Sequence, residues 1–149
     1  MLNAQPSNKK WTGTWATAPY EAGTNTPPSP YLANNTLRQI IRVSIGGDTL
    51  RVKFSNRTCS NPVTMNSVNI AISIDASTSI IDSSTLKQLK FNGSESVTIN
   101  AYSEITSDPM AFELVPGARL AITIYYGDCQ ISSDMTFHYG SRTDSYILP

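Results

Sequence analysis

The sequence predicts an all-β protein, a jelly-roll-like β-sandwich of about nine or ten short antiparallel strands. Three observations support this fold class. Apolar and polar residues alternate with a period of two over several segments, which is the pattern of a strand with one buried face. β-branched residues and small hydroxyl residues are abundant, and both suit a pleated sheet. Turn signals containing glycine separate the segments, and no amphipathic helical window competes with them.

The elements follow in order after a leader at residues 1–9 that is predicted to be flexible. Residues 10–17 are the first predicted strand, and four prolines between residues 19 and 30 then indicate an irregular loop, because proline cannot donate to a ladder. Alternation is clearest in three segments, which are residues 50–54, 68–75 and 120–126. Weaker strands are predicted at residues 89–91, 97–101, 110–114, 135–139 and 145–148. Residues 83–90 are also compatible with a short helix.

Gly46 and Gly47 are predicted to form a hairpin turn between two strands. If the apolar residues of both strands face the core, four basic side chains share the opposite face; these are Arg38, Arg42, Arg51 and Lys53. Such a face could hold an anionic glycan or an acidic patch of a neighbouring domain, or it could be an ordinary solvated face. No aromatic residue accompanies the four, which weakens the sugar-binding interpretation.

Length and charge restrict the function classes. The 149 residues fit one domain, 1–149, that can bury a core without disulfides or metal. Eleven basic and eleven acidic residues cancel, so neither nucleic acid nor an anionic membrane is a predicted partner. No apolar stretch approaches the roughly 20 residues of a membrane span. The first six residues lack the charged and apolar regions of a signal peptide, although Leu-Asn-Ala-Gln resembles the surroundings of a cleavage site.

Five stretches of the sequence are informative because of their order and spacing. Residues 11–20 read Trp-Thr-Gly-Thr-Trp-Ala-Thr-Ala-Pro-Tyr, residues 36–48 read Thr-Leu-Arg-Gln-Ile-Ile-Arg-Val-Ser-Ile-Gly-Gly-Asp, and residues 51–56 read Arg-Val-Lys-Phe-Ser-Asn. Ser-Asp-Pro at 107–109 and Thr-Phe-His-Tyr-Gly-Ser-Arg-Thr-Asp-Ser-Tyr-Ile at 136–147 follow. In this order and spacing the stretches resemble the N-terminal β-sandwich region of secreted SGNH (GDSL-like) hydrolases.

The resemblance implies a non-catalytic accessory module. In that family the β-rich module precedes a catalytic domain that opens with a Gly-Asp-Ser nucleophile block and carries a later Asp-x-x-His, and both are missing from this chain. The implied partner is that catalytic domain in cis, the implied location is secreted or periplasmic, and the parent is expected to be an esterase of acetylated polysaccharide. The family's β-module continues beyond these stretches, so an apolar surface is expected near Phe137 and Tyr146. The alternative is a free-standing carbohydrate-binding module.

Two residues invite a catalytic interpretation. Thr49 lies in Gly-Asp-Thr-Leu, which looks like the nucleophile block with threonine replacing serine, but it follows a turn and begins a strand, whereas such nucleophiles sit where a strand meets a helix. His138 is the only histidine, so any Ser-His-Asp triad must use it, with Asp134 or Asp144 as nominal partners. We predict a structural turn at Thr49, a structural or domain-contact role for His138, and no catalytic residue in this chain.

Two residue pairs could shape function. Trp11 and Trp15 would share one face of a strand, where an exposed pair could stack on sugar rings and a buried pair, the commoner case, would fill the core or a domain interface. Cys59 and Cys129 are a candidate disulfide, although sequence cannot show that the two meet. Two cysteines and one histidine are too few for a zinc site, and no cofactor is predicted.

Overall fold

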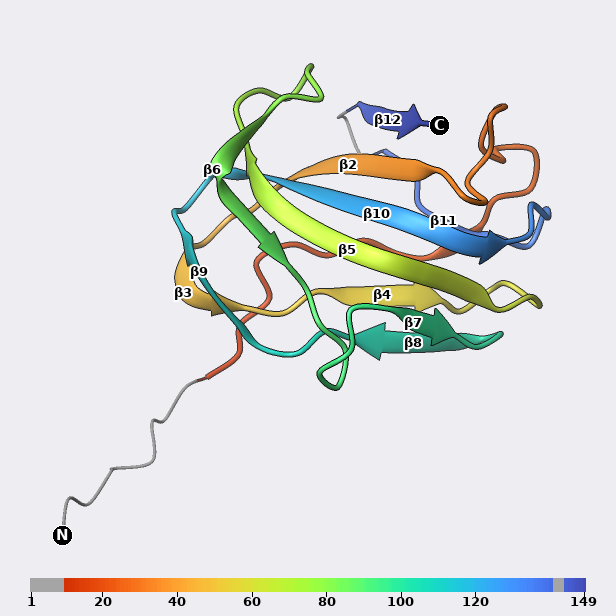
Figure 1. Cartoon of the computed structure of the whole chain (residues 1–149), viewed down its shortest axis with the longest axis horizontal. Coiled ribbons are helices and arrows are strands. Elements are labelled where there is room, and N and C mark those ends of the chain that lie inside the picture. The colour runs from red at the N-terminus through yellow and green to blue at the C-terminus, as the bar shows by residue number, and fades with distance from the viewer. Residues whose placement is uncertain (1–9, 141–143) are drawn as a thin grey trace, which may run out of the picture.

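The structure, a computed structural model, describes residues 10–140 and 144–149, so the predicted leader lies outside the described residues. Within these residues the chain forms twelve strands and no helix, and every strand pairing is antiparallel (Figure 1). The strands are β1 (Tyr20–Glu21), β2 (Thr36–Arg42), β3 (Gly47–Leu50), β4 (Lys53–Asn56), β5 (Val63–Ser73), β6 (Ile81–Gln88), β7 (Val97–Ile99), β8 (Ser103–Thr106), β9 (Met110–Leu114), β10 (Arg119–Cys129), β11 (Thr136–Phe137) and β12 (Ser145–Leu148). The predicted all-β sandwich is confirmed.

One layer is a large sheet built on the two longest strands. Its order is β12-β2-β10-β5-β6, and β7 pairs with β5 beyond the end of β6. Register places apolar residues of three strands on one face: Ile124 of β10 lies opposite Val68 of β5 and Leu37 of β2. The alternation in residues 68–75 and 120–126 therefore reports the inner face of this sheet. Within the described part of the chain, its outer strands are β12 at one edge and β6 and β7 at the other.

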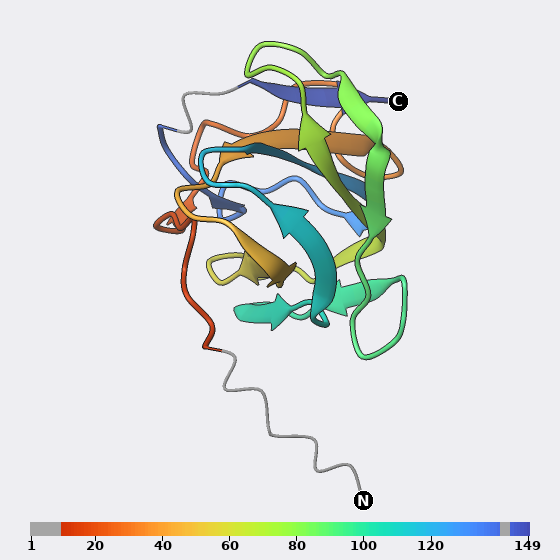
Figure 2. The same ribbon diagram turned by 90° about the vertical axis from the view of Figure 1, so that its left-hand side faces the viewer.

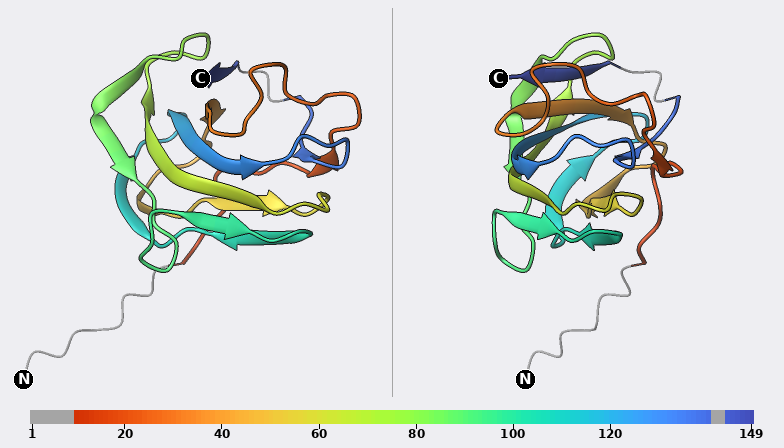
Figure 3. Two further views of the ribbon diagram at one scale, coloured as in Figure 1. Left: turned by 45° about the vertical axis from the view of Figure 1, so that its right-hand side comes forward. Right: turned by 90° about the vertical axis from the view of Figure 1, so that its right-hand side faces the viewer.

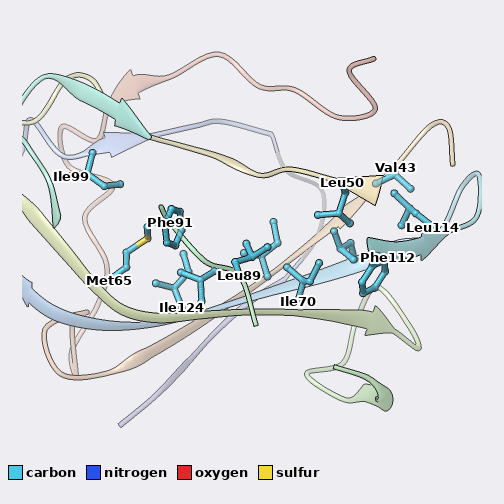
Figure 4. Close-up of a cluster of buried hydrophobic side chains, with 13 residues drawn as sticks. Val43, Leu50, Met65, Ile70, Leu89, Phe91, Ile99, Phe112, Leu114 and Ile124 are labelled. Carbon is cyan, nitrogen blue, oxygen red and sulfur yellow. The ribbon is translucent and has the colours of Figure 1, made fainter. Parts of the chain in front are cut away.

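The second layer consists of short ribbons. β3 pairs with β9 and β4 pairs with β8, and Figure 2 shows β3 and β9 side by side. Buried side chains of β5 and β10, among them Ile70 and Ile124, meet Leu50, Phe112 and other residues of the ribbons in one apolar cluster (Figure 4). Burial of this apolar surface is the main stabilising contribution to the fold.

The predicted hairpin at residues 46–47 is wrong. β2 pairs with β10 and β12, whereas β3 pairs with β9, so the chain crosses from one layer to the other at this point. A Cβ atom on Gly46 would lie 2.2 Å from the carbonyl oxygen of Leu114 and 2.9 Å from Cδ of Pro116. Glycine is therefore needed here for a close approach between backbones, and alternation on either side of it is the same for a crossing as for a hairpin.

Gly46→Ala is expected to lower the free energy of unfolding by about 1–3 kcal/mol, because the added methyl group forces the backbone near Leu114 to move. Gly47→Ala is the matched control, since the nearest atom to its Cβ would be 3.9 Å away. Urea unfolding of both variants measures the difference. Equal losses for the two substitutions would contradict the close-approach argument.

Two other expectations are corrected. The short helix considered at residues 83–90 is wrong, because residues 83–88 belong to strand β6 beside β5. Residues 89–91 lie outside the named strands, but the N–H of Leu89 donates to the carbonyl of Val68 at 2.8 Å and Phe91 forms an isolated bridge with Ser94. The predicted strands at residues 110–114 and 145–148 are confirmed as β9 and β12.

Candidate functional site

The segment before β1 is attached to the turn between β2 and β3 by one threonine. The carbonyl of Thr14 accepts hydrogen bonds from the N–H of Ser44 at 3.0 Å and from its hydroxyl at 2.9 Å. The Thr14 hydroxyl donates to the carbonyl of Ile45 at 2.7 Å and accepts from its N–H at 3.0 Å. The strand predicted at residues 10–17 is therefore wrong: this segment belongs to no strand, and Thr14 fixes the backbone between the two tryptophans.

Trp11 and Trp15 both line a cleft of about 1760 Å³. Trp11 is 52 % exposed and Trp15 is 40 % exposed, so neither fills the core of this chain, contrary to the commoner expectation for tryptophan. The inner faces of β2 and β12 form one wall of the cleft, with half-buried aliphatic side chains such as Leu37 and Ile147. Phe54 of β4 is among the residues that line it from the second layer.

Five aromatic rings are in sequential contact, and we call Tyr20, Tyr139, Phe137, His138 and Trp15 the aromatic row. All but Tyr20 line the cleft. Tyr20 lies opposite Phe137 in the pairing of β1 with β11, which Figure 3 shows side by side. Successive ring centroids are 5.8 Å (Tyr20–Tyr139), 5.1 Å (Tyr139–Phe137), 6.3 Å (Phe137–His138) and 5.8 Å (His138–Trp15) apart. These separations are those of aromatic pairs in direct contact.

His138 is a member of this row and not of a triad. Its Nδ1 atom is buried and has no hydrogen-bond partner in the described part of the chain. Asp134, its nominal partner, instead accepts a hydrogen bond from the N–H of Ser60 at 2.9 Å. Thr49 lies in strand β3, which continues into no helix, and its hydroxyl donates to Asp48 Oδ1 at 2.8 Å. This geometry agrees with structural roles for both residues.

The four basic residues do not share a sheet face, so the predicted positive face is wrong. Arg38 and Arg42 belong to β2 in the large sheet, Lys53 begins β4 in the second layer, and Arg51 lies between β3 and β4. Arg38 donates to Oγ1 of Thr123 at 2.8 Å. The guanidinium of Arg51 lies 5.0 Å from the centre of the Trp11 ring, within the range of a cation–π contact.

Comparisons with known proteins do not extend this picture. No protein-family model matches the chain, and no curated protein does. Among the residues that the structure describes, no group of three or more His, Cys, Asp or Glu side chains is placed to hold a metal ion. No helix in the same residues is long and apolar enough to cross a membrane.

The two cysteines lie close enough to interact, and both are buried free thiols. Burial, and then the neighbouring Cys59, raise the pKa of Cys129 to about 11. The Cys59 sulfur lies 3.7 Å from Asp134 Oδ1 and 3.8 Å from the Ser132 hydroxyl. Hydrogen bonds from Ser132 and Ser60 hold the pKa of the Asp134 carboxyl well below its usual range. The candidate disulfide is therefore not formed in this structure, although both of its cysteines are buried.

Sequence reasoning found Trp11, Trp15 and His138, and it named Phe137 for an apolar surface, but it missed Tyr20 and Tyr139 as ring partners. Tyr20 reaches Tyr139 only because the two-residue strands β1 and β11 pair across nearly the whole chain. No local pattern marks strands that short. Of the two residues expected near an apolar surface, Phe137 lines the cleft, whereas Tyr146 is on the face of β12 opposite to Ile147.

Proposed function

We propose that this chain is the non-catalytic N-terminal accessory module of a secreted or periplasmic SGNH-type esterase, with acetylated polysaccharide as the parent's substrate class. The proposal rests on the resemblance of the quoted stretches, and one structural observation carries it further. This observation is the open apolar cleft beside β12. The role that follows is to support or cap a catalytic domain that packs against this side of the sandwich.

The cleft favours the proposal of a partner domain because one wall of the cleft belongs to the apolar face of the large sheet. Leu37 of β2 and Ile147 of β12 lie opposite each other in the register, on the same face as the buried Ile124 of β10. Unlike Ile124, both are only half-buried. Protein interiors are close-packed, and an apolar surface open on this scale is typical of a site that another protein segment covers.

The proposal assigns no chemistry to this chain. An acyl-transfer nucleophile needs an adjacent base and a group that orients that base. His138 contacts aromatic rings, and Asp134 is engaged by Ser60 and Ser132. Hydrolysis would therefore belong to the catalytic domain.

The coding sequence that follows Pro149 is expected to contain a Gly-Asp-Ser block and, later, Asp-x-x-His. A chain extended through that domain is expected to hydrolyse an aryl acetate, to melt at a higher temperature and to scatter light as a monomer, whereas residues 1–149 alone show no turnover and associate through the cleft. The proposal is wrong if the short chain is monomeric and melts as high as the extended one. Turnover by the short chain that disappears in His138→Ala would also overturn it.

Adjacent residues of β12 provide a matched pair for the docking surface. Ile147 lines the cleft, whereas the neighbouring Leu148 is exposed and its side chain points to the other face. In the extended chain, Ile147→Asp is expected to remove most of the gain in melting temperature, because a carboxylate would be buried against the partner. Leu148→Asp is expected to leave that gain in place. The same loss for both substitutions would place the catalytic domain elsewhere.

A further inference from the structure

We propose that the aromatic row binds a single chain of a neutral oligosaccharide at the mouth of the cleft. This inference goes beyond the accessory role and does not depend on it, because the row lies along the pair of β1 and β11, whereas the proposed docking surface is the wall of the cleft formed by β2 and β12. It assigns the exposed rings of Tyr20, Tyr139 and Trp15 as stacking surfaces. Phe137 and His138 connect these rings, because Phe137 contacts Tyr139 and His138 contacts Trp15.

Exposure of the rings is the first observation. Tyr20 is 55 % exposed and Tyr139 is 60 % exposed, and both are in ring contact with the rest of the row. Contiguous exposed aromatic surface of this kind marks a binding site in a soluble domain. The negative face of an aromatic ring attracts the C–H groups on one face of a pyranose, while the phenol and indole groups can hydrogen-bond to the sugar hydroxyls.

The angles between the rings select the form of the ligand. The planes of Tyr20 and Tyr139 meet at 67°, those of Phe137 and Tyr139 at 89°, and those of Trp15 and His138 at 72°. Rings turned in this way cannot form a plane against a flat crystalline polysaccharide. They suit one flexible chain whose successive sugars present different faces.

Charge around the row favours a neutral sugar over an acidic one. Two of the cationic side chains that line the cleft are already engaged: Arg51 lies over the Trp11 ring at 5.0 Å, and Lys53 pairs with Glu104 at 2.5 Å. The row itself contributes phenol, imidazole and indole groups and no carboxylate or ammonium. The five side chains of the row therefore offer a uronic acid no permanent positive charge to replace its lost hydration.

The site is organised before any ligand arrives. Thr14 fixes the backbone next to Trp15, the pairing of β1 with β11 fixes Tyr20, and the Asn25 amide donates to the Tyr139 hydroxyl at 3.3 Å. Asn25 is held in turn by a bond from the same amide to the carbonyl of Ala22 at 3.1 Å. Rings held in this way lose little conformational entropy when a ligand stacks on them.

Tryptophan fluorescence tests the proposal directly, because the chain has two tryptophans and both line the cleft. Titrations of the full chain use xylohexaose, cellohexaose and mannohexaose as neutral probes and a galacturonic acid hexamer as the acidic comparison. At least one neutral hexasaccharide is expected to give a saturable change in emission, at least about tenfold tighter than the acidic one. No saturable change with any neutral probe up to millimolar concentration would overturn the proposal, and so would tighter binding of the acidic hexamer.

Variants at two tyrosines identify the surface. Tyr139→Ala is expected to weaken binding by about tenfold, and Tyr139→Phe to retain most of it, because the stacking ring remains. Tyr125→Ala is the matched control, since Tyr125 is an exposed tyrosine of β10 in the large sheet and lies outside the row. Circular dichroism melting checks that each variant is folded. Equal affinities for Tyr139→Ala and Tyr125→Ala would show that sugars bind elsewhere, and the melting gain of the extended chain would be untouched by that result.

Discussion

Asn56→Asp is expected to lower the free energy of unfolding by about 3–5 kcal/mol at neutral pH, because it places an uncompensated charge in a buried site. Asn56 is 5 % exposed and ends strand β4. Its amide nitrogen lies 2.8 Å from the carbonyl oxygen of Asn61, 3.1 Å from that of Asn100 and 3.5 Å from that of Ile99. This side chain thus joins the loop after β4 to the end of β7, and aspartate would face three acceptors without a donor.

The loss is expected to depend on pH in a defined direction. Burial and the surrounding carbonyl oxygens disfavour the carboxylate, so the pKa of Asp at position 56 would be raised in the folded state. The folded variant then binds more protons than the unfolded one, and its stability falls as pH rises from about 4 toward neutrality. Urea unfolding at several pH values measures this slope. Asn66→Asp, at an exposed position of β5, has the same charge change and is expected to cost little; equal losses would refute the role given to Asn56.

Oxidation is expected to join Cys59 and Cys129 and to stabilise the fold by an amount on the order of 4 kcal/mol, because the bond closes a loop of about 70 residues. Both thiols are free and buried, and Cys59 adds to the effect of burial that raises the pKa of Cys129. With oxidised glutathione as the oxidant, the protein loses two protons and two electrons and two molecules of reduced glutathione are released. Intact mass before and after alkylation detects the bond. Two freely alkylated thiols in folded protein after prolonged oxidation would refute it.

The same thiol makes the reduced protein sensitive to alkali. The pKa of Cys129 is raised from near 9 to about 11 when the chain folds, mainly by burial. Its contribution to stability is therefore complete below about pH 9 and is lost as pH rises toward 11. Oxidation should also be faster at pH 9 than at pH 7, since the thiolate is the reacting form. Cys129→Ala removes this ionisation and is expected to flatten the alkaline decline.

The central strands were predictable because their chemistry is local. Residues 120–126 lie in β10, which has β2 on one side and β5 on the other. Its alternate apolar residues Leu120, Ile122 and Ile124 face the core and are buried, so the period of two in the sequence is the period of two of the strand. At Gly46 the same signal failed. Alternation does not record which strand is the neighbour, and the close approach to Leu114 involves residues nearly 70 positions apart.

The site was predictable only in part, for a related reason. The two tryptophans and His138 are rare residues, so composition alone drew attention to them. Their exposure and their ring partners depend on how Thr14 binds the turn between β2 and β3 and on how β1 meets β11. These are long-range contacts made by one threonine and by two strands of two residues each, and neither leaves a periodic signature.

The pairing of β2 with β10 also limits how early the large sheet can form during synthesis of the chain. Thr36 of β2 pairs with Tyr125 of β10, so this strand has no β10 partner while about 90 further residues are synthesised, roughly 4–18 s at ordinary rates of synthesis. During that interval an alternating, β-prone segment has no partner, and non-local pairing is slow to form even afterwards. The large sheet therefore assembles only after β10 has been synthesised. A nascent chain that stays extended for so long suits a translocation channel that accepts only unfolded polypeptide, in keeping with the proposed export.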